Sequence, residues 1–301
     1  EAANLVSIYA AMADESVDQV LARFAGQGFG AFKPALGELL VETLRQSVLA
    51  IVSQIRAGSF SPAQTEVRFG HGAPFPPIRL SLADGSSALI GGVIDRVDRA
   101  VVGGRELLRI VDYKTGGRDF DFAGVLQGLT LQLPLYLLAA AERAETRAGL
   151  YYMPISQPVV SDNEEDIEGA VAQAFRLKGL TLSDAAVVRA SDNALAGGKS
   201  AVLYQVEQTG EAEYTGSVCT TAQMESLLLL AKKKSEQTLS RMLDGELAAS
   251  PAARKKNQEA CKYCDYKSVC RFDPKKPGNR IRLLNSIKQD EFFNLIAGGD
   301  A

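Results

Sequence analysis

Apolar residues recur at helical spacing in four parts of the chain, because side chains three and four positions apart share one face of a helix. In the last of these parts, Thr220 or Thr221 is a suitable N-cap and Gly245 a suitable end. We expect the first two helices to form a scaffold. The four predicted helices cover about residues 3–24, 35–56, 119–145 and 220–247.

Short runs rich in β-branched and apolar residues predict strands between these helices. Asp84 and Gly85 have the composition of a hairpin turn within one such run. Strands interspersed with helices predict an α/β fold with a mixed central sheet flanked by helices. The predicted strands lie within residues 65–70, 76–100, 107–116, 147–156 and 201–208.

The length and composition suggest a catalytic domain with appended parts. The chain has 301 residues, of which 46% are hydrophobic and 23% charged, as is ordinary for a soluble globular protein. We expect a helical scaffold over 1–60, a core with insertions over 61–250 and a cysteine-rich segment over 251–301. No apolar run approaches the ~20 residues of a membrane helix, so no membrane partner is expected.

Two carboxylates and a lysine stand out within the apolar runs 89–98 and 107–116, which a short glycine turn joins. Asp112 and Lys114 are two positions apart and therefore share one face of a strand. Apolar residues precede both Asp112 and Asp95, so we expect both acids to end largely buried strands. Two acids can hold Mg²⁺ or Mn²⁺, and a neighbouring lysine can position or deprotonate the water that attacks phosphorus.

A simpler interpretation is a structural ion pair, because a lone Asp-x-Lys in a hairpin is usually a solvated cross-strand pair. The apolar residues before each acid favour a metal site, since buried acids need partners. The residues therefore point to a metal-dependent phosphodiesterase.

A second motif lies near the end of the chain, where Cys261, Cys264 and Cys270 fall within ten residues. Such a group binds metal or forms disulfides. Cys219 is the one other cysteine, and no signal peptide is evident, so a secreted disulfide framework is not expected and a cytoplasmic location is. Zinc would require a fourth ligand, and the single histidine, His71, is distant in sequence and is expected in a loop.

The run from Gly92 to Asp98 (G-V-I-D-R-V-D), the run Val111 to Gly116 (V-D-Y-K-T-G) and a later helix with Gln132 and Tyr136 together resemble the AddB-type, RecB-like branch of the PD-(D/E)XK nucleases. The resemblance implies a restriction-endonuclease-like core. It also implies that Asp95, Asp112 and the carbonyl of Tyr113 bind a divalent metal ion, that Lys114 is catalytic, and that Gln132 and Tyr136 pack beside the site.

The cysteine spacing resembles the iron–sulfur segment of the same branch, in which three C-terminal cysteines join a fourth from upstream of the core. This implies that Cys261, Cys264 and Cys270 bind a [4Fe–4S] cluster. Cys219 does not match the fourth position, and a small buried hydrophobic role is the simpler interpretation for it. The chain begins with Glu, so we expect a fragment of a larger protein, with the fourth cysteine and an upstream metal-site residue outside it.

Two further features are weaker. Glu66 matches an E-x-x-F-G pattern of AddB-type proteins, yet a structural acid at a strand edge is the simpler interpretation, so Glu66 is not among the predicted site residues. Basic clusters flank the cysteines, and phosphate contact and a solvated surface are about equally good interpretations. No P-loop is present, and Gly198-Lys199-Ser200 is expected to be a loop turn.

The resemblance implies a metal-dependent DNA exonuclease domain of a helicase–nuclease complex that processes double-strand breaks for recombinational repair. Its partners would be a single DNA strand from an unwound duplex end and a second helicase–nuclease subunit. Alternatives are a stand-alone RecB-like or CRISPR-type exonuclease, a catalytically inactive DNA-binding module with the nuclease fold, and a zinc-stapled nucleic-acid binder.

Overall fold

The computed structural model describes residues 2–115, 119–141, 145–156, 166–246, 248–254 and 260–298. Contacts group the chain into two compact units. Unit 1 comprises Glu1–Pro76, Gly91–Phe120 and Tyr136–Met224, and unit 2 comprises Pro77–Ile90, Asp121–Leu135 and Glu225–Ala301. The chain thus passes between the units several times. The domain boundaries that were predicted after residues 60 and 250 stay a prediction.

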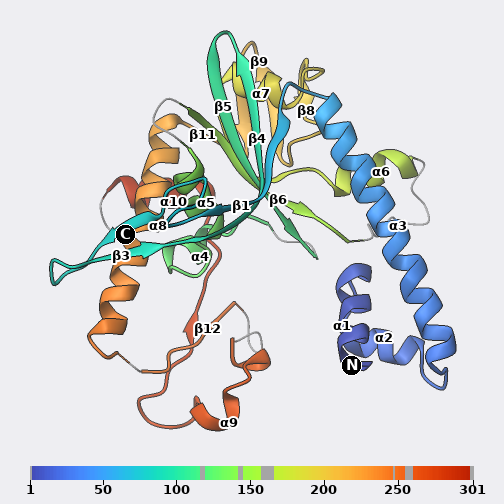
Figure 1. Cartoon of the computed structure of the whole chain (residues 1–301), viewed down its shortest axis with the longest axis vertical. Coiled ribbons are helices and arrows are strands. Elements are labelled where there is room, and N and C mark those ends of the chain that lie inside the picture. Colours follow the sequence, from blue (N-terminus) through green and yellow to red (C-terminus); the bar gives the residue numbers. More distant parts are fainter. Residues whose placement is uncertain are drawn as a thin grey trace. The chain divides into compact units, whose positions relative to one another are not determined.

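A six-stranded mixed sheet forms the centre of unit 1, in the order β1-β4-β5-β6-β7-β11 (Figure 1). Antiparallel pairing joins β1 to β4, β4 to β5 and β6 to β7, whereas β6 runs parallel to β5 and β11 parallel to β7. This confirms the predicted α/β class with a mixed sheet. The strands are β1 (Ser61–Phe69), β4 (Gly92–Val102), β5 (Arg105–Lys114), β6 (Thr146–Pro154), β7 (Lys178–Leu182) and β11 (Val218–Cys219).

Three N-terminal helices of unit 1, α1 (Ala2–Ala13), α2 (Val17–Arg23) and α3 (Phe29–Arg56), share an apolar cluster that includes Tyr9 and Phe32. The single helix predicted over 3–24 is wrong, because Asp14 adopts a φ of 53° and the Ser16 hydroxyl caps a new helix at Gln19 N. Helix α3 starts earlier than the pattern predicted.

Helices and a small second sheet cover the face of the central sheet that carries Leu107 and Val111. Helix α7 (Ala185–Ser191) packs Val187 and Ala190 against Leu107 and its neighbours. The three-stranded sheet places Val206 in the same core as Val111. Its strands are β8 (Gly198–Lys199), β9 (Val206–Gly210) and β10 (Glu213–Gly216), and helix α6 (Ile167–Ala174) belongs to the same unit. Residues 198–199 are therefore an edge strand and not the loop turn that was predicted, and the strand predicted over 201–208 begins only at Val206.

Unit 2 assembles short elements from distant parts of the sequence. Its hairpin turns at Gly85, whose φ is 84°, as the Asp-Gly pair predicted. Ring contacts of Phe122 with Phe292 and Phe293 join helix α10 to helix α4. The elements are β2 (Ile78–Ser81), β3 (Ser87–Ile90), α4 (Phe122–Leu126), β12 (Ala252–Ala253), η1 (Ala260–Tyr263), α9 (Lys267–Cys270), β13 (Arg282–Leu283) and α10 (Gln289–Ala297).

Two helices span the division between the units. The helix predicted over 119–145 is in fact α4 and α5 (Gln132–Ala140), separated at Gly128, whose φ is 74°. Helix α8 (Thr221–Leu243) matches its prediction, with the Thr220 hydroxyl accepting from Gln223 N at 3.2 Å and Gly245 following its end. Within the described residues, no helix is long and apolar enough to cross a membrane.

Candidate nuclease site

The two predicted metal-binding acids lie beside each other on adjacent strands of unit 1. Arg96 on β4 pairs with Val111 on β5, so the antiparallel register places Asp95 opposite Asp112, and opposite residues project from the same face. Asp112 lies near the end of β5, as expected. Asp95 lies near the start of β4, not at its end, because β4 continues to Val102.

Lys114 joins this face two residues beyond Asp112. Its Nζ is 2.5 Å from Oδ2 of Asp112, and the lysine side chain is 24% exposed while that of Asp112 is 1% exposed. The same ammonium lies 5.7 Å from the centre of the Tyr152 ring on β6. The expected Asp-x-Lys geometry is therefore present, with a buried acid and an accessible lysine.

The backbone of Tyr113 fixes Asp95. The amide N–H of Tyr113 donates to Oδ2 of Asp95 at 3.0 Å. This bond directs one oxygen of Asp95 toward the strand that carries Asp112 and Lys114. The structure thus brings together Asp95, Asp112, Tyr113 and Lys114.

A buried charge network occupies the opposite face of the same two strands. Arg96 donates from Nε and Nη2 to the two oxygens of Asp98, each at 2.7 Å, and Arg109 Nε donates to Oδ2 of Asp98 at 2.9 Å. All three side chains are at most 1% exposed. Arg109 also stacks over Phe60, with its guanidinium carbon 4.3 Å from the ring centre.

The pKa values of Asp98 and Arg96 are shifted in the direction that favours their charged forms. Burial tends to raise the pKa of Asp98, but the charge of Arg109 and the hydrogen bonds from Arg96 outweigh it and hold that pKa below its ordinary value. Burial tends to lower the pKa of Arg96, and its contacts with Asp98 more than compensate, so that pKa is raised. The network was not predicted from the sequence, although Arg96 and Asp98 are two positions apart and therefore share one face of a strand.

The helix residues of the motif are in different units. Helix α5 begins at Gln132, which belongs to unit 2, so its proposed role stays a prediction. Tyr136 belongs to unit 1 and lies one turn further on. Its ring is 5.8 Å from that of Phe69 at the end of β1, so Tyr136 packs on the strand that neighbours β4.

Glu66, left out of the predicted site, lies next to Asp95 in the sheet. The flanking residues Thr65 and Val67 pair with Arg96 and Ile94, which places Glu66 beside Asp95. Its φ of 49° is unusual for a residue in a strand. Within the described ranges, no group of three or more His, Cys, Asp or Glu side chains is gathered closely enough to hold a metal ion.

The donor set nevertheless fits a hard divalent cation. Asp95 and Asp112 offer carboxylate oxygens, and Tyr113 offers a backbone carbonyl. Mg²⁺ is commonly held by one or two carboxylates and completes its octahedron with waters and substrate phosphate oxygens. Two protein carboxylates are therefore sufficient for such an ion, and they lie beside a lysine that can act on the substrate.

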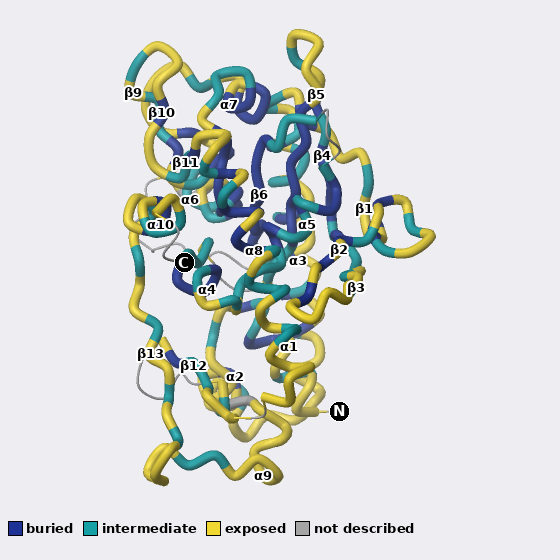
Figure 2. The backbone as a smooth tube through the Cα atoms, turned by 90° about the vertical axis from the view of Figure 1, so that its left-hand side faces the viewer, coloured by how far each residue is buried: buried dark blue, intermediate teal, exposed yellow. Residues whose placement is uncertain are grey.

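The three C-terminal cysteines lie in or between two short elements of unit 2, where Cys264 and Cys270 are exposed and Cys261 is partly exposed. Cys261 is in η1 and Cys270 in α9, and Figure 2 shows the chain around α9 as exposed. The described part of the chain does not gather them into a metal-binding group. Cys219 is buried in β11 of unit 1, where burial raises the pKa of its thiol to about 12, as suits a small hydrophobic residue rather than a thiolate ligand.

Comparison with known proteins agrees with this geometry. Residues 4–271 match the family model described as the PD-(D/E)XK nuclease superfamily. The chain belongs to this superfamily, whose members generally use divalent metal ions.

Similarity to curated proteins points to a more specific group within the superfamily. The chain is 33% identical to the B-type subunit of an ATP-dependent helicase/deoxyribonuclease from Acetivibrio thermocellus over 296 residues, covering 94% of this chain and 26% of the relative. It is 31% identical to the protein of that name from Thermoanaerobacter sp., covering 87% and 24%. With that from Clostridium novyi the identity is 32%, covering 86% and 24%. The chain therefore spans about a quarter of the length of these relatives.

Proposed function

We propose that this chain is the nuclease domain of a helicase–deoxyribonuclease of this type, and that it hydrolyses phosphodiester bonds of DNA. The observation that carries the proposal is the position of Lys114 Nζ, 2.5 Å from buried Asp112 on the face that also bears Asp95. The substrate would be one strand of a duplex end that a partner subunit unwinds. Processing of double-strand breaks for recombinational repair, in the cytoplasm, is the process such an activity would serve.

Each residue of the site would have a separate role in the hydrolysis. A bound Mg²⁺ or Mn²⁺ would polarise the phosphate and lower the pKa of a water. Asp95 and Asp112, with the carbonyl of Tyr113, would hold that ion. Lys114 would orient the attacking water and offset the negative charge that develops at phosphorus. Tyr113, through its amide, would keep Asp95 in place.

The same proposal assigns Cys261, Cys264 and Cys270 as three ligands of a [4Fe–4S] cluster. The exposure of Cys264 and Cys270 is compatible with ligands that close around a cluster with a further donor. Iron and acid-labile sulfide, measured after anaerobic purification, test this assignment. Zinc in place of iron would contradict it and favour a zinc-stapled segment.

The decisive experiment measures degradation of end-labelled single- and double-stranded DNA with Mg²⁺ or Mn²⁺. Wild type is compared with Lys114→Ala and with Lys199→Ala, a control at an exposed lysine on β8. Cleavage by wild type and by the control, but not by Lys114→Ala, is expected. Equal cleavage by all three proteins would contradict the role of Lys114, and DNA binding without any cleavage would favour an inactive binding module.

A further inference from the structure

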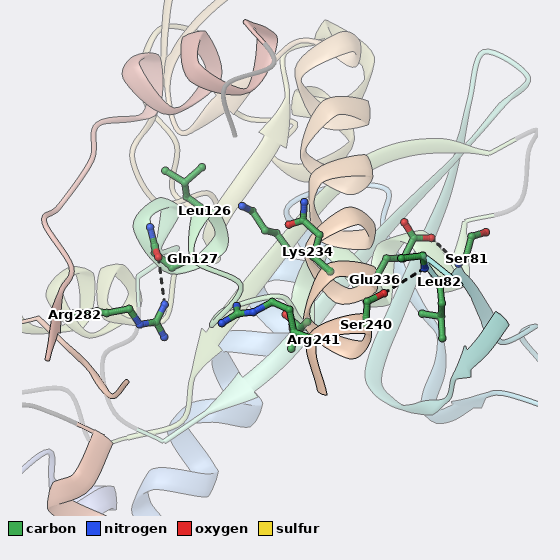
Figure 3. Close-up of a pocket in the computed structure, with 12 residues that line it drawn as sticks. Ser81, Leu82, Leu126, Gln127, Lys234, Glu236, Ser240, Arg241 and Arg282 are labelled. Atoms are coloured by element: carbon green, nitrogen blue, oxygen red, sulfur yellow. Dashed lines mark hydrogen bonds between the residues drawn. The ribbon is translucent and has the colours of Figure 1, made fainter. Parts of the chain in front are cut away.

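A groove of about 610 Å³ lies within unit 2, in the size range of ligand sites. Its lining comes from the end of β2, the turn after α4, the C-terminal half of α8 and β13 (Figure 3). None of these segments takes part in the nuclease site described above.

Hydrogen bonds connect the walls of the groove. Ser81 N donates to Oε1 of Glu236 at 2.8 Å, which attaches the β2–β3 hairpin to α8. On the other side, Arg282 Nε donates to the carbonyl oxygen of Ser250 at 3.0 Å, and Arg282 Nη1 donates to Oε1 of Gln127 at 3.4 Å. The arginine is therefore held in place at the rim.

Positive charge converges on this space. Figure 3 shows Lys234 and Arg241 extending from α8 toward the side on which Gln127 and the guanidinium of Arg282 lie. Glu236, the acid of the lining, points away toward Ser81. Three lining cations outnumber Glu236, and Arg241 is paired with Glu246 outside the lining, so Lys234 and Arg282 are the cations best placed to meet an anion.

The position of Lys234 disfavours its own charge. Burial lowers the pKa of Lys234, and the neighbouring charge of Lys233 lowers it further. Arg282 adds a second cation on the same side. An anion between these two residues would relieve both effects, since it places a negative charge next to Lys234, whereas Glu236 points toward Ser81.

The chemistry of the lining selects among anions. Amide and hydroxyl groups of Gln127, Gln237, Thr238 and Ser240 accompany the cations, and no aromatic side chain is among the described lining residues. Stacking on aromatic rings is the usual means of holding bases, whereas cations with hydroxyl and amide donors bind phosphates without reading sequence. The lining therefore suits a phosphate backbone better than a base.

We propose that the groove between β2, α4, α8 and β13 binds the sugar-phosphate backbone of a nucleic-acid strand, with Lys234 and Arg282 as the principal phosphate contacts. This proposal deepens the proposed function, because it identifies a contact for the DNA strand outside the catalytic face. It predicts binding that is independent of base sequence and strongly dependent on salt.

The test is fluorescence anisotropy of a labelled single-stranded oligonucleotide in EDTA, over a range of salt concentrations. For the Lys234→Ala/Arg282→Ala protein, the slope of log affinity against log salt is expected to fall by about 1.4, since each single-strand phosphate contact contributes ~0.7. At low salt the affinity should drop on the order of tenfold for each lost contact. Two oligonucleotides of different sequence should respond alike.

A matched control removes the same charges elsewhere. Arg189→Ala/Lys199→Ala replaces an exposed arginine and an exposed lysine of unit 1 and should leave the slope close to that of wild type. Equal losses in both double variants would overturn the proposal, because net charge alone would then explain them. An unchanged slope in the groove variant would overturn it as well. If the alanine variant melts early, Lys234→Gln/Arg282→Gln removes the charges while keeping polar side chains.

One further measurement distinguishes a groove that binds a nucleic-acid strand from a site for small anions. Titration of inorganic phosphate tests a site for small anions: phosphate binding that the groove variant loses, with unchanged oligonucleotide affinity, would overturn the proposal. Because EDTA removes the divalent ions, binding is measured independently of cleavage. A failure of the nuclease proposal appears as absence of Lys114-dependent cleavage, and a failure of the groove proposal as wild-type binding by the groove variant.

Discussion

Nη1 of Arg96 donates a hydrogen bond of 3.1 Å to the hydroxyl of Tyr113. The amide of the same tyrosine holds Asp95 on the other face of the sheet. Tyr113 therefore connects the buried charge network to the candidate metal-binding acids. The face that carries Asp95 is thus linked, through Tyr113, to buried charges on the opposite face of the sheet.

Replacing Tyr113 by Phe removes the hydroxyl acceptor and keeps the amide. We expect a loss of about 1–3 kcal/mol in the free energy of unfolding, because Nη1 of Arg96 loses its partner in a buried position. Cleavage should persist, since Asp95 keeps its hydrogen bond. Urea unfolding measures the first effect and the DNA assay the second. Tyr204→Phe, which loses only a 3.5 Å contact with Gln205, should unfold like wild type.

Replacing Asp98 by Asn should be more damaging. The variant leaves Arg96 and Arg109 buried without their carboxylate, and breaking a buried ion pair costs about 3–5 kcal/mol. Chemical denaturation measures the change in the unfolding free energy. Asp84→Asn, in the exposed hairpin turn, serves as the control. Comparable unfolding of the two variants would refute a structural role for the buried network.

Acid should lower the free energy of unfolding that Asp98 contributes through this network. The pKa of Asp98 is lowered in the folded protein, so its stabilisation is fully present above the unfolded-state pKa, about 3.9. It is lost as the pH falls through the lower folded value. Unfolding free energies measured from neutral pH to about pH 3 should therefore fall in wild type, and the gap to Asp98→Asn should narrow. A constant gap would contradict the assignment.

Replacing Asp112 by Asn should lower the rate of DNA cleavage by on the order of 10²–10³-fold, because a metal ion supplies several kcal/mol of transition-state stabilisation. Raising the Mn²⁺ concentration should restore part of the rate if the weakened step is metal binding. Asp244→Asn, at an exposed position after α8, should cleave at the wild-type rate. If Asp112→Asn cleaved DNA at the wild-type rate at low Mn²⁺, Asp112 would be excluded as a metal ligand.

Replacing Gly58 or Gly37 by Ala should change the stability of the protein in opposite directions. A Cβ at Gly58 would lie 2.0 Å from the carbonyl oxygen of Ala190, so Gly58→Ala should destabilise unit 1 by forcing the backbone apart. Gly37, in α3, has open space around it, and Gly37→Ala should stabilise by about 0.5–1 kcal/mol through helix propensity. Thermal melting of both variants checks the pair.

Local spacing explains which parts of the site could be predicted. Asp112 and Lys114 share a face because strand side chains alternate, and the family resemblance identified Asp95 with them. The partnership of Asp98 with Arg109 was not predictable in this way, since it depends on the register between two strands. Glu66 was interpreted as a structural acid at a strand edge, and its nearness to Asp95 was not predictable because it follows from the pairing of β1 with β4.

Prediction of the fold from local sequence is limited in the same way. Helix α8 was predicted closely because its caps and its apolar face lie in one continuous segment. The break at Gly128 was missed because apolar residues continue on both sides of it and hide the change in backbone direction. The groove of unit 2 joins segments far apart in the sequence, and no periodicity within one segment indicates such a site.

The interleaving of the two units has a consequence for synthesis on the ribosome. The β2–β3 hairpin is complete at Ile90, but its hydrogen-bonding partner Glu236 on α8 emerges more than a hundred residues later. At a synthesis rate of ~5–20 residues per second, roughly 7–30 s pass between the emergence of the hairpin and that of Glu236. An isolated two-stranded hairpin is marginally stable in water. During that interval its strand edges are available to other chains, so folding in the cell would benefit from a chaperone that shields them.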